Sequence, residues 1–195
     1  KTPALGGRPN RDYDQAYVYV SALTLEPDNS VFNWRFVHDR DKAAPAIKRR
    51  GTLAQIWQEA NHWQASGYGV FLTVNEMDGT GYDANGRPIQ GQSGDTLEHV
   101  RGVRAHVVDL DNLAAMQNLE RAKAHMPAPW FAVQTSPGKA HVYWPLHGSE
   151  RYHNNDTYRI LQRKLRQLYD GDKAVVDATR ILRVPGFLHQ KGEPH

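Results

Sequence analysis

The residues at positions 104–112 are Arg-Ala-His-Val-Val-Asp-Leu-Asp-Asn, and they set our expectation for the centre of the fold. Positions 103–110 are rich in apolar, β-prone residues and therefore predict a buried strand. In a strand, side chains two positions apart lie on the same face, so Asp109 and Asp111 project together. Two adjacent carboxylates repel each other unless a cation neutralises them. The pair therefore predicts a site for an oxygen-ligated divalent cation, Mg²⁺ or Mn²⁺.

The same two residues also have a purely structural interpretation. The pattern Asp-x-Asp is common at strand ends, and Asp111 or Asn112 could cap a helix that follows. The pair by itself leaves both interpretations open, so other signals along the chain have to decide between them.

Expected strands and helices alternate on both sides of this strand. Further strands are expected at residues 17–25, 31–37, 70–75, 130–135 and 141–146, and helices at residues 52–66, 112–125 and 158–168. Thr52 and Gln55 form a predicted capping box, and Gly67 is the expected end of that helix. The alternation favours an α+β or α/β fold with mixed sheets.

The chain is expected to form one domain with two lobes. Its length of 195 residues suits a single large domain, and 39% hydrophobic residues are enough for a core. The expected parts are an N-terminal arm at 1–14, a lobe at about 15–69 and a metal- and nucleotide-binding core at about 70–191, within a domain that extends to 195. Within the core, residues 79–95 predict a long polar loop, and residues 169–191 are expected to be irregular.

Composition narrows the chemistry and the compartment. The chain has no cysteine, which excludes disulfides and Cys-ligated zinc or iron–sulfur sites within it and fits the cytoplasm. No apolar run approaches the roughly 20 residues that span a bilayer, so no membrane partner is expected. The net charge of +3 and a pI near 9.1 fit a polyanionic partner.

A second signal is the stretch Ser-Pro-Gly-Lys-Ala-His at positions 136–141. A turn with a glycine presents backbone N–H groups, and Lys139 adds a fixed positive charge. Ser136 and His141 add hydrogen-bonding groups, and Lys139 and His141 share one face of a strand. These groups would suit a triphosphate. The alternative is an ordinary hairpin with a solvated lysine and a structural histidine.

A third signal lies in residues 170–191, where acidic residues precede a row of cations. Arg180 and Arg183 are three positions apart and could contact phosphates of a nucleotide or a template. Asp172 and Asp177 are two candidates for a third carboxylate. Asp177 could instead cap a short turn and pair with Arg180.

The three signals together resemble one known family. The order D-x-D, then S-x-G-K-x-H-V-Y-W, then D-x4-D-x2-R-x2-R-x-P-G-F-x3-K is similar to that of the archaeo-eukaryotic primase superfamily, and more closely to the RepB-like primases of plasmids and phages. The resemblance covers residues 70–191. It implies a primase-polymerase catalytic core with a modified RRM-like sheet, here with an N-terminal αβ lobe, and metal-dependent, template-directed nucleotidyl transfer.

The resemblance also implies a role for each matching residue. The catalytic metal ligands would be Asp109, Asp111 and Asp172, with Asp177 as the alternative to Asp172. The nucleotide-binding residues would be Ser136, Lys139, His141, Arg180 and Arg183, and the nucleic-acid-binding residues His189 and Lys191. Asn75 resembles a polar position that precedes the first motif, and an equally good interpretation is a strand-end cap.

The function expected from these roles is that of a DNA primase or primase-polymerase. Its partners would be a single-stranded DNA template, an NTP or dNTP, and a helicase or further replication domains, in the cytoplasm of a bacterial host of a plasmid, phage or integrated element. The abrupt ends of the chain suggest a domain of a longer protein. The main alternative is a catalytically silent module that binds single-stranded DNA or a replication origin. A metal-dependent nuclease is a weaker alternative. The turn at residues 136–141 suits a triphosphate, and a nuclease does not bind one.

Overall fold

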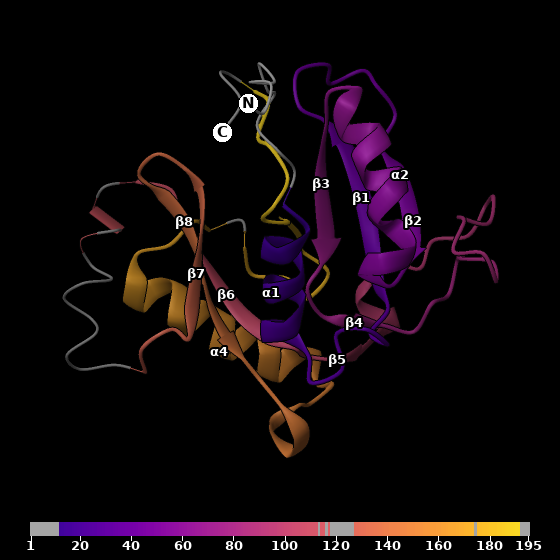
Figure 1. Cartoon of the computed structure of the whole chain (residues 1–195). Coiled ribbons are helices and arrows are strands. Elements are labelled where there is room, and N and C mark those ends of the chain that lie inside the picture. Colours follow the sequence, from indigo (N-terminus) through magenta and orange to yellow (C-terminus); the bar gives the residue numbers. More distant parts are fainter. Residues whose placement is uncertain (1–11, 113, 116, 118–126, 174, 192–195) are drawn as a thin grey trace.

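Two antiparallel sheets lie side by side in the computed structural model of the protein, which describes residues 12–112, 114, 115, 117, 127–173 and 175–191 (Figure 1). The four-stranded sheet has the order β2-β1-β3-β9, and the three-stranded sheet has the order β6-β8-β7. The strands of the first sheet are β1 (Phe32–His38), β2 (Ile47–Gly51), β3 (Tyr68–Thr73) and β9 (Ile181–Arg183). Those of the second are β6 (Ala105–Leu110), β7 (Phe131–Ser136) and β8 (Lys139–Pro145). Two short strands, β4 (Glu76–Met77) and β5 (Val100–Gly102), pair with each other in a separate two-stranded sheet.

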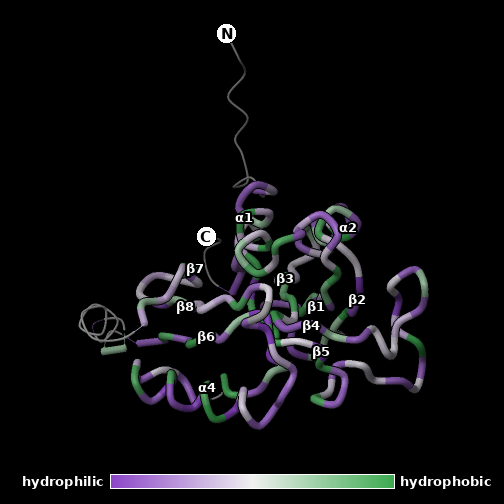
Figure 2. The backbone as a smooth tube through the Cα atoms, turned by 90° about the horizontal axis from the view of Figure 1, so that it is seen from below, coloured by the Kyte–Doolittle hydropathy of each residue, from purple (hydrophilic) through white to green (hydrophobic). Residues whose placement is uncertain are grey.

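Three described helices pack against these sheets. They are α1 (Tyr13–Leu23), α2 (Leu53–Ala65) and α4 (Asn155–Tyr169), and two single 3-10 turns are η1 (Leu97–His99) and η2 (Gly148–Glu150). Figure 2 shows α4 along the face of the three-stranded sheet that points away from α1. No helix within the described ranges is long and apolar enough to cross a bilayer.

The main core lies between the two sheets and joins them to α1. The hydroxyl groups of Tyr19 in α1 and Tyr143 in β8 lie 3.2 Å apart in the buried interior. Phe131 of β7 stacks on Tyr143 with ring centroids 4.5 Å apart. Because β6 alternates strictly, Ala105 and Val107 face this core while Val108 and Leu110 face α4.

Several predicted elements are confirmed. The α+β class, the strands β1, β3 and β6 and the β7–β8 hairpin are present, and so is helix α4. The capping box of α2 has both of its hydrogen bonds, from the Gln55 backbone N–H to Thr52 and from the Thr52 N–H to the Gln55 side chain. Gly67 follows the helix with φ of +92°, a conformation that favours glycine.

Two predictions about the N-terminal part are wrong. Residues 17–25 do not form a strand, because positions 13–23 form α1, whose buried side chains Ala16, Tyr19, Val20 and Leu23 recur at helical spacing. The tyrosines and valines of this segment favour strands locally, but packing against the sheets overrides that preference. The predicted arm is shorter than expected, since Tyr13 and Asp14 belong to α1 and the Asp12 carboxylate caps it.

The prediction of an irregular 169–191 segment is wrong in one part. Residues of β9 pair with β3, with Leu182 opposite Leu72. A strand of three residues is too short to give a periodic pattern, and its partner lies more than a hundred positions away in the sequence. The four-stranded sheet therefore takes strands from both predicted lobes. The remainder of the predicted arm, and most of the predicted helix at 112–125, lie outside the described residues.

Helix α4 is attached to β6 through one buried amide. Gln162 is fully buried, and its Oε1 accepts hydrogen bonds from the Val107 N–H at 3.3 Å and from His106 Nδ1 at 3.0 Å. Its amide nitrogen donates to the carbonyls of Val107 and Val175. The Gln162 side chain thus replaces a neighbouring strand on the free edge of β6. Since Gln162 Oε1 can only accept, His106 carries its proton on Nδ1, and His106 Nε2 accepts from the Tyr152 hydroxyl at 2.7 Å.

We expect this histidine to make folding stability depend on pH. Burial lowers the pKa of His106 from its ordinary value of 6.5, and the hydrogen bond to Gln162 opposes this only in part. Below pH 6.5 the unfolded chain therefore binds a proton that the folded chain does not, so the free energy of unfolding should fall as the pH drops towards the folded pKa. Urea denaturation at several pH values between 7.5 and 5 measures this slope. His106→Gln should reduce the slope, while His153→Gln at an exposed position should leave it unchanged. An equal slope in His106→Gln and the parent protein would contradict this assignment.

Candidate active site

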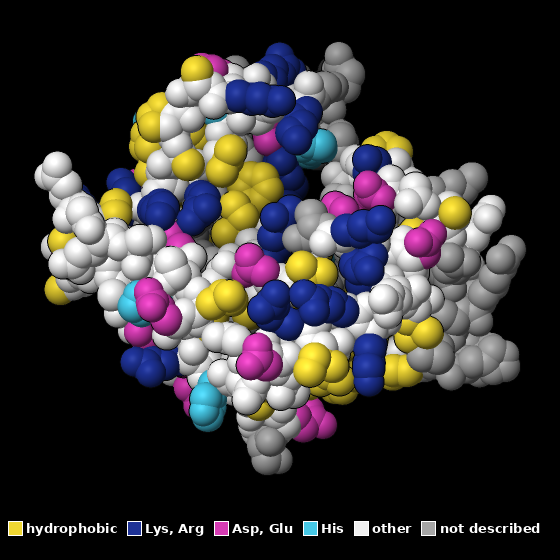
Figure 3. Space-filling model, turned by 180° about the vertical axis from the view of Figure 1, so that it is seen from behind, with side chains coloured by type: hydrophobic (Ala, Val, Ile, Leu, Met, Phe, Trp, Pro, Cys, Tyr) yellow, Lys and Arg dark blue, Asp and Glu magenta, His cyan; other side chains and the backbone are white. Residues whose placement is uncertain are grey.

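A pocket of about 450 Å³ opens between the two sheets. One wall comes from β6 and the β7–β8 hairpin and the other from β3, β9 and the segment that follows β9. Its polar lining residues are Asp109, Asp111, Thr135, Ser136, Lys139, His141, Arg180, Arg183, His189 and Lys191. Figure 3 shows a hollow on the back of the molecule, beside which Lys and Arg side chains gather near acidic and histidine side chains. The three separate sequence signals therefore meet in one place.

The two predicted carboxylates stand at the end of β6. Asp109 lies directly opposite His141 in the pairing of β6 with β8, and Asp109 Oδ2 is 3.6 Å from His141 Nε2. Asp111 lies just beyond the strand, where its Oδ1 accepts a hydrogen bond from Asn112 Nδ2 at 3.2 Å. The Asn112 side chain also accepts from the Ala115 N–H at 2.8 Å. Capping therefore falls to Asn112, and both aspartates line the pocket.

The hairpin contributes three of the expected residues. Gly138, with φ of +74°, forms the turn between β7 and β8, and no atom lies within 4 Å of where its side chain would start. Lys139 is exposed and His141 is buried, yet both line the pocket, as expected for positions on one strand face. The buried Nδ1 of His141 has no hydrogen-bond partner among the residues that the structure describes. Buried polar atoms almost always have a partner, so this nitrogen of a pocket-lining residue is a notable exception.

The candidates for a third carboxylate lie next to the pocket. The Asp172 N–H donates to the Asp109 carbonyl at 2.9 Å, so the chain after α4 runs directly along the end of β6. This approach depends on Gly171, because a side chain there would collide with Val108. The Asp177 carboxylate accepts from the Thr179 N–H and hydroxyl, which confirms its predicted turn cap. Neither Asp172 nor Asp177 is among the described pocket-lining residues, so the third metal ligand stays a prediction.

The donor set fits a hard divalent cation that is shared with a substrate. Within the described ranges, no three Asp, Glu or His side chains gather into a complete metal-binding group. Mg²⁺ usually keeps several waters and takes only one or two carboxylates together with substrate phosphates. Asp109 and Asp111 supply the two carboxylates, and the surrounding cations suit phosphates.

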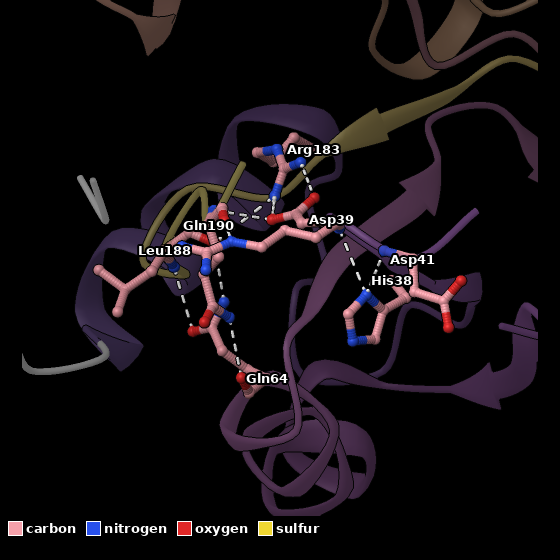
Figure 4. A network of polar contacts seen from close by, with 8 residues as sticks. His38, Asp39, Asp41, Gln64, Arg183, Leu188 and Gln190 are labelled. Carbon is pink, nitrogen blue, oxygen red and sulfur yellow. Dashed lines mark hydrogen bonds and ion pairs between the residues drawn. The ribbon is translucent and has the colours of Figure 1, made fainter. Parts of the chain in front are cut away.

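Arg183 lines the pocket, and its guanidinium also forms an ion pair with the carboxylate of Asp39 (Figure 4). Arg183 Nη2 lies 2.7 Å from Asp39 Oδ1, and the group stacks over the Phe71 ring at 4.6 Å. Asp39 also accepts from the Gln190 N–H at 2.7 Å. Arg183 therefore joins the end of β1 to the segment that carries His189 and Lys191. Its expected contact with nucleotide stays a prediction, as do the contact of the exposed Arg180 with nucleotide and that of the exposed Lys191 with nucleic acid.

Gln64 holds the same segment from α2. The Gln64 Oε1 accepts from the Leu188 N–H at 3.1 Å, and Gln64 Nε2 donates to the Leu188 carbonyl at 2.9 Å. Neither Asp39 nor Gln64 belongs to a motif, and no signal in the sequence indicated them, because each acts on a residue far away in the chain. Thr135 and Phe71 also line the pocket without having been predicted.

Asn75 has a structural position. Its Oδ1 accepts from the backbone N–H groups of Arg104 and Ala105, and its Nδ2 donates to the Ala178 carbonyl. This buried amide connects the end of β3 to the beginning of β6 and to the turn before Arg180, as the strand-end interpretation expected.

Comparison with known proteins agrees with the resemblance. The model of one protein family, the RepB DNA-primase N-terminal domain, matches residues 58–195, more than half of the chain. No curated protein matches the chain.

Three solved structures share its fold. The AEP domain of the cyanophage S-2L primase-polymerase (PrimPol) aligns with a TM-score of 0.70 and 20% identity, over 94% of this chain and 86% of that one. The primase RepB′ aligns with a TM-score of 0.59 and 18% identity, over 91% of this chain and 52% of that one. The catalytic domain of RepB′ in complex with initiator DNA aligns with a TM-score of 0.59 and 18% identity, over 93% and 82%. At such identity the likeness shows the fold alone, and it confirms the predicted α+β primase-polymerase fold.

Asp39 should be essential for stability. The Asp39 and Arg183 side chains are only 2% and 11% exposed, and loss of one partner leaves a buried charge without its counterion. Asp39→Ala should lower the free energy of unfolding by about 3–5 kcal/mol, measured by urea denaturation. Asp41→Ala, which removes an exposed carboxylate two positions away, is the matched control. A similar small effect of both changes would contradict the structural role of the pair.

Proposed function

The chain belongs to the RepB-like primases of the archaeo-eukaryotic primase superfamily, and on that premise we propose that it joins nucleotides on a single-stranded DNA template. One observation carries this proposal. The aspartate pair at the end of β6, the Lys139–His141 strand face and the cations of residues 180–191 line the same pocket between the sheets. Acidic groups for a metal and basic groups for phosphates thus face each other across one cavity.

Asp109 and Asp111 would hold Mg²⁺ or Mn²⁺, which when bound supplies the positive charge that activates a 3′-hydroxyl and stabilises the leaving pyrophosphate. Asp172 is the preferred third ligand, because its backbone N–H is bonded to the Asp109 carbonyl and keeps it beside the pair. Asp177 is the weaker alternative, since Thr179 already occupies its carboxylate.

The hairpin would bind the triphosphate of an incoming NTP or dNTP. Lys139 is exposed and lines the pocket, and its positively charged ammonium group would bind a phosphate oxygen. Ser136 supplies a hydroxyl group beside it. The His141 Nδ1, which has no partner among the described residues, would bond a phosphate oxygen if it carries a proton.

The opposite wall would contact phosphates of the template or the growing strand. Arg180 and Lys191 are exposed cations, and His189 lines the pocket together with them. One of the aligned structures is a RepB′ catalytic domain in complex with initiator DNA, which supports DNA as the polymer here. Arg183 would act mainly through Asp39, by keeping this wall in place.

The wider setting would be replication of a plasmid, phage or integrated element. This chain spans about half the length of the aligned RepB′ primase, so further domains or a helicase would supply other steps.

A catalytically silent module that binds single-stranded DNA or an origin is the second candidate. The exposed cations Lys139, Arg180 and Lys191 of the pocket would serve DNA binding in this case as well. The two candidates differ in one measurable property, which is metal-dependent incorporation of labelled nucleotides on a primed or unprimed template.

Replacement of either strand aspartate should abolish synthesis. We expect Asp109→Asn and Asp111→Asn each to lower product yield by at least about 100-fold, because loss of metal binding raises the barrier by several kcal/mol. The assay uses single-stranded template, labelled NTP or dNTP and Mg²⁺ or Mn²⁺, followed by sizing of the products. Asp28→Asn makes the same charge change at an exposed site outside the pocket and should retain activity. Full synthesis by both strand variants would refute the catalytic proposal, and no synthesis by the parent with any metal would favour the silent module.

Replacement of Lys139 should weaken the binding of the nucleotide more than the binding of the metal ion. Lys139→Gln removes one charge-assisted contact, which corresponds to a roughly tenfold or greater rise in KM for the nucleotide. Steady-state kinetics at varied nucleotide concentration measure this rise. Lys173→Gln, at an exposed lysine outside the pocket lining, is the matched control. An unchanged KM in Lys139→Gln would assign the triphosphate to another part of the pocket.

A further inference from the structure

A second pocket, of about 550 Å³, lies at the opposite end of β6 from the aspartate pair. It forms where the end of α1, β4 and the beginning of β6 come together (Figure 1). Its lining residues are Leu23, Thr24, Leu25, Glu26, Asn29, Ser30, Val31, Arg50, Glu76, Arg104, Leu146, His147, Gly148 and Arg151. None of them lines the candidate active site. Arg104 and Asp109 are five positions apart on an extended chain, which separates them by about 16 Å.

Arg104 is a buried cation whose hydrogen bonds are incomplete. The residue is 4% exposed, and its guanidinium stacks over the Phe32 ring at 4.2 Å. Arg104 Nη2 donates to the Val31 carbonyl at 3.3 Å. Within the described ranges, its Nε and Nη1 have no acceptor. Buried polar groups almost always have a partner, and unsatisfied charged donors are especially costly.

The surrounding charge is positive and only partly neutralised. Glu76 pairs with Arg151 at 2.6 Å, whose Nε also lacks a partner in the described part of the chain. Arg50 donates to two neutral acceptors, the Asn33 side chain and the Met77 carbonyl. Burial above all, together with the nearby Arg151 and Arg50 and against the opposing effect of Glu76, lowers the pKa of Arg104 to about 10. An anion at this place would relieve both the desolvation and the repulsion.

We propose that this pocket binds a phosphomonoester, a phosphate group with a free end such as that of a nucleotide or of a 5′-phosphorylated DNA strand. Arginine side chains bind phosphate through charged N–H donors, and the Nε and Nη1 of Arg104, on opposite sides of its guanidinium, both lack an acceptor among the described residues. Because Arg104 is buried in the pocket, a terminal phosphate reaches it more readily than a phosphate inside a continuous strand. The cavity lies within the range of about 300–1,000 Å³ that is typical of small-molecule sites.

The walls suit the organic part of such a ligand. Leu23, Leu146 and Val31 provide apolar surface, and Thr24 and Ser30, whose hydroxyls lie 2.7 Å apart, provide polar groups. Because this pocket shares no lining residue with the candidate active site, phosphate could bind here whether or not the protein joins nucleotides.

Binding of defined phosphates tests the proposal directly. The probes are inorganic phosphate, AMP, and one short single-stranded DNA prepared with either a 5′-phosphate or a 5′-hydroxyl. Affinities are measured by titration calorimetry of the whole chain in metal-free buffer. Arg104→Gln and Arg151→Gln should each weaken the binding of the phosphate probe by roughly tenfold or more, since each loses a charge-assisted hydrogen bond. Lys139→Gln, which removes a cation from the candidate active site, separates binding there from binding at this pocket, and Lys173→Gln, at an exposed lysine outside both pockets, should leave the binding within about twofold of the parent.

Arg151 is 31% exposed at the edge of the pocket, so Arg151→Gln reports on the site even if the buried Arg104 variant fails to fold. Binding of AMP without a preference for 5′-phosphorylated DNA identifies a free nucleotide, and a preference for the 5′-phosphate identifies a strand end; both support the proposal. Failure of every probe to bind the parent at millimolar concentration overturns it. Binding that depends on Lys139 and not on Arg151 overturns it as well.

Discussion

Asp109 lies opposite His141 in the antiparallel pairing of β6 with β8, and the candidate active site depends on this register. A slip of one residue would turn Asp109 and Asp111 towards α4 and bring Val108 and Leu110 into the pocket. The register is held on one side by β8 and on the other by Gln162, whose amide bonds both backbone groups of Val107. A single buried glutamine thus fixes the free edge of the strand that carries the aspartate pair.

The second wall of the pocket depends on long-range contacts of a different kind. β9 adds to β3, and the Asp39–Arg183 pair holds the next residues against the end of β1. A buried pair of this sort contributes little net stability compared with an apolar pair of the same shape, but it specifies one geometry. Here that geometry brings His189 and Lys191 to face the hairpin.

Both ends of β6 carry groups whose charge is only partly compensated within the described chain. At one end two carboxylates stand beside phosphate-suited cations, and at the other Arg104 is buried with free donors. The single strand β6 would thus connect two separate places that bind phosphates. The aspartate end would engage phosphates through a metal, and the Arg104 end would engage them directly.

The sequence by itself determined the parts of the protein that rest on local patterns. The alternation of β6, the hairpin at 136–139 and the capping box of α2 follow from neighbouring residues, and the order of motifs indicated the family. Tertiary structure alone decided that 13–23 is a helix, because the apolar stripe of α1 has a core to pack against. It also decided the pairing of β9, the bond between Asp39 and Arg183, and the pocket around Arg104. Each of these joins residues that are far apart in the chain, and such contacts leave no periodic or local signal in the sequence.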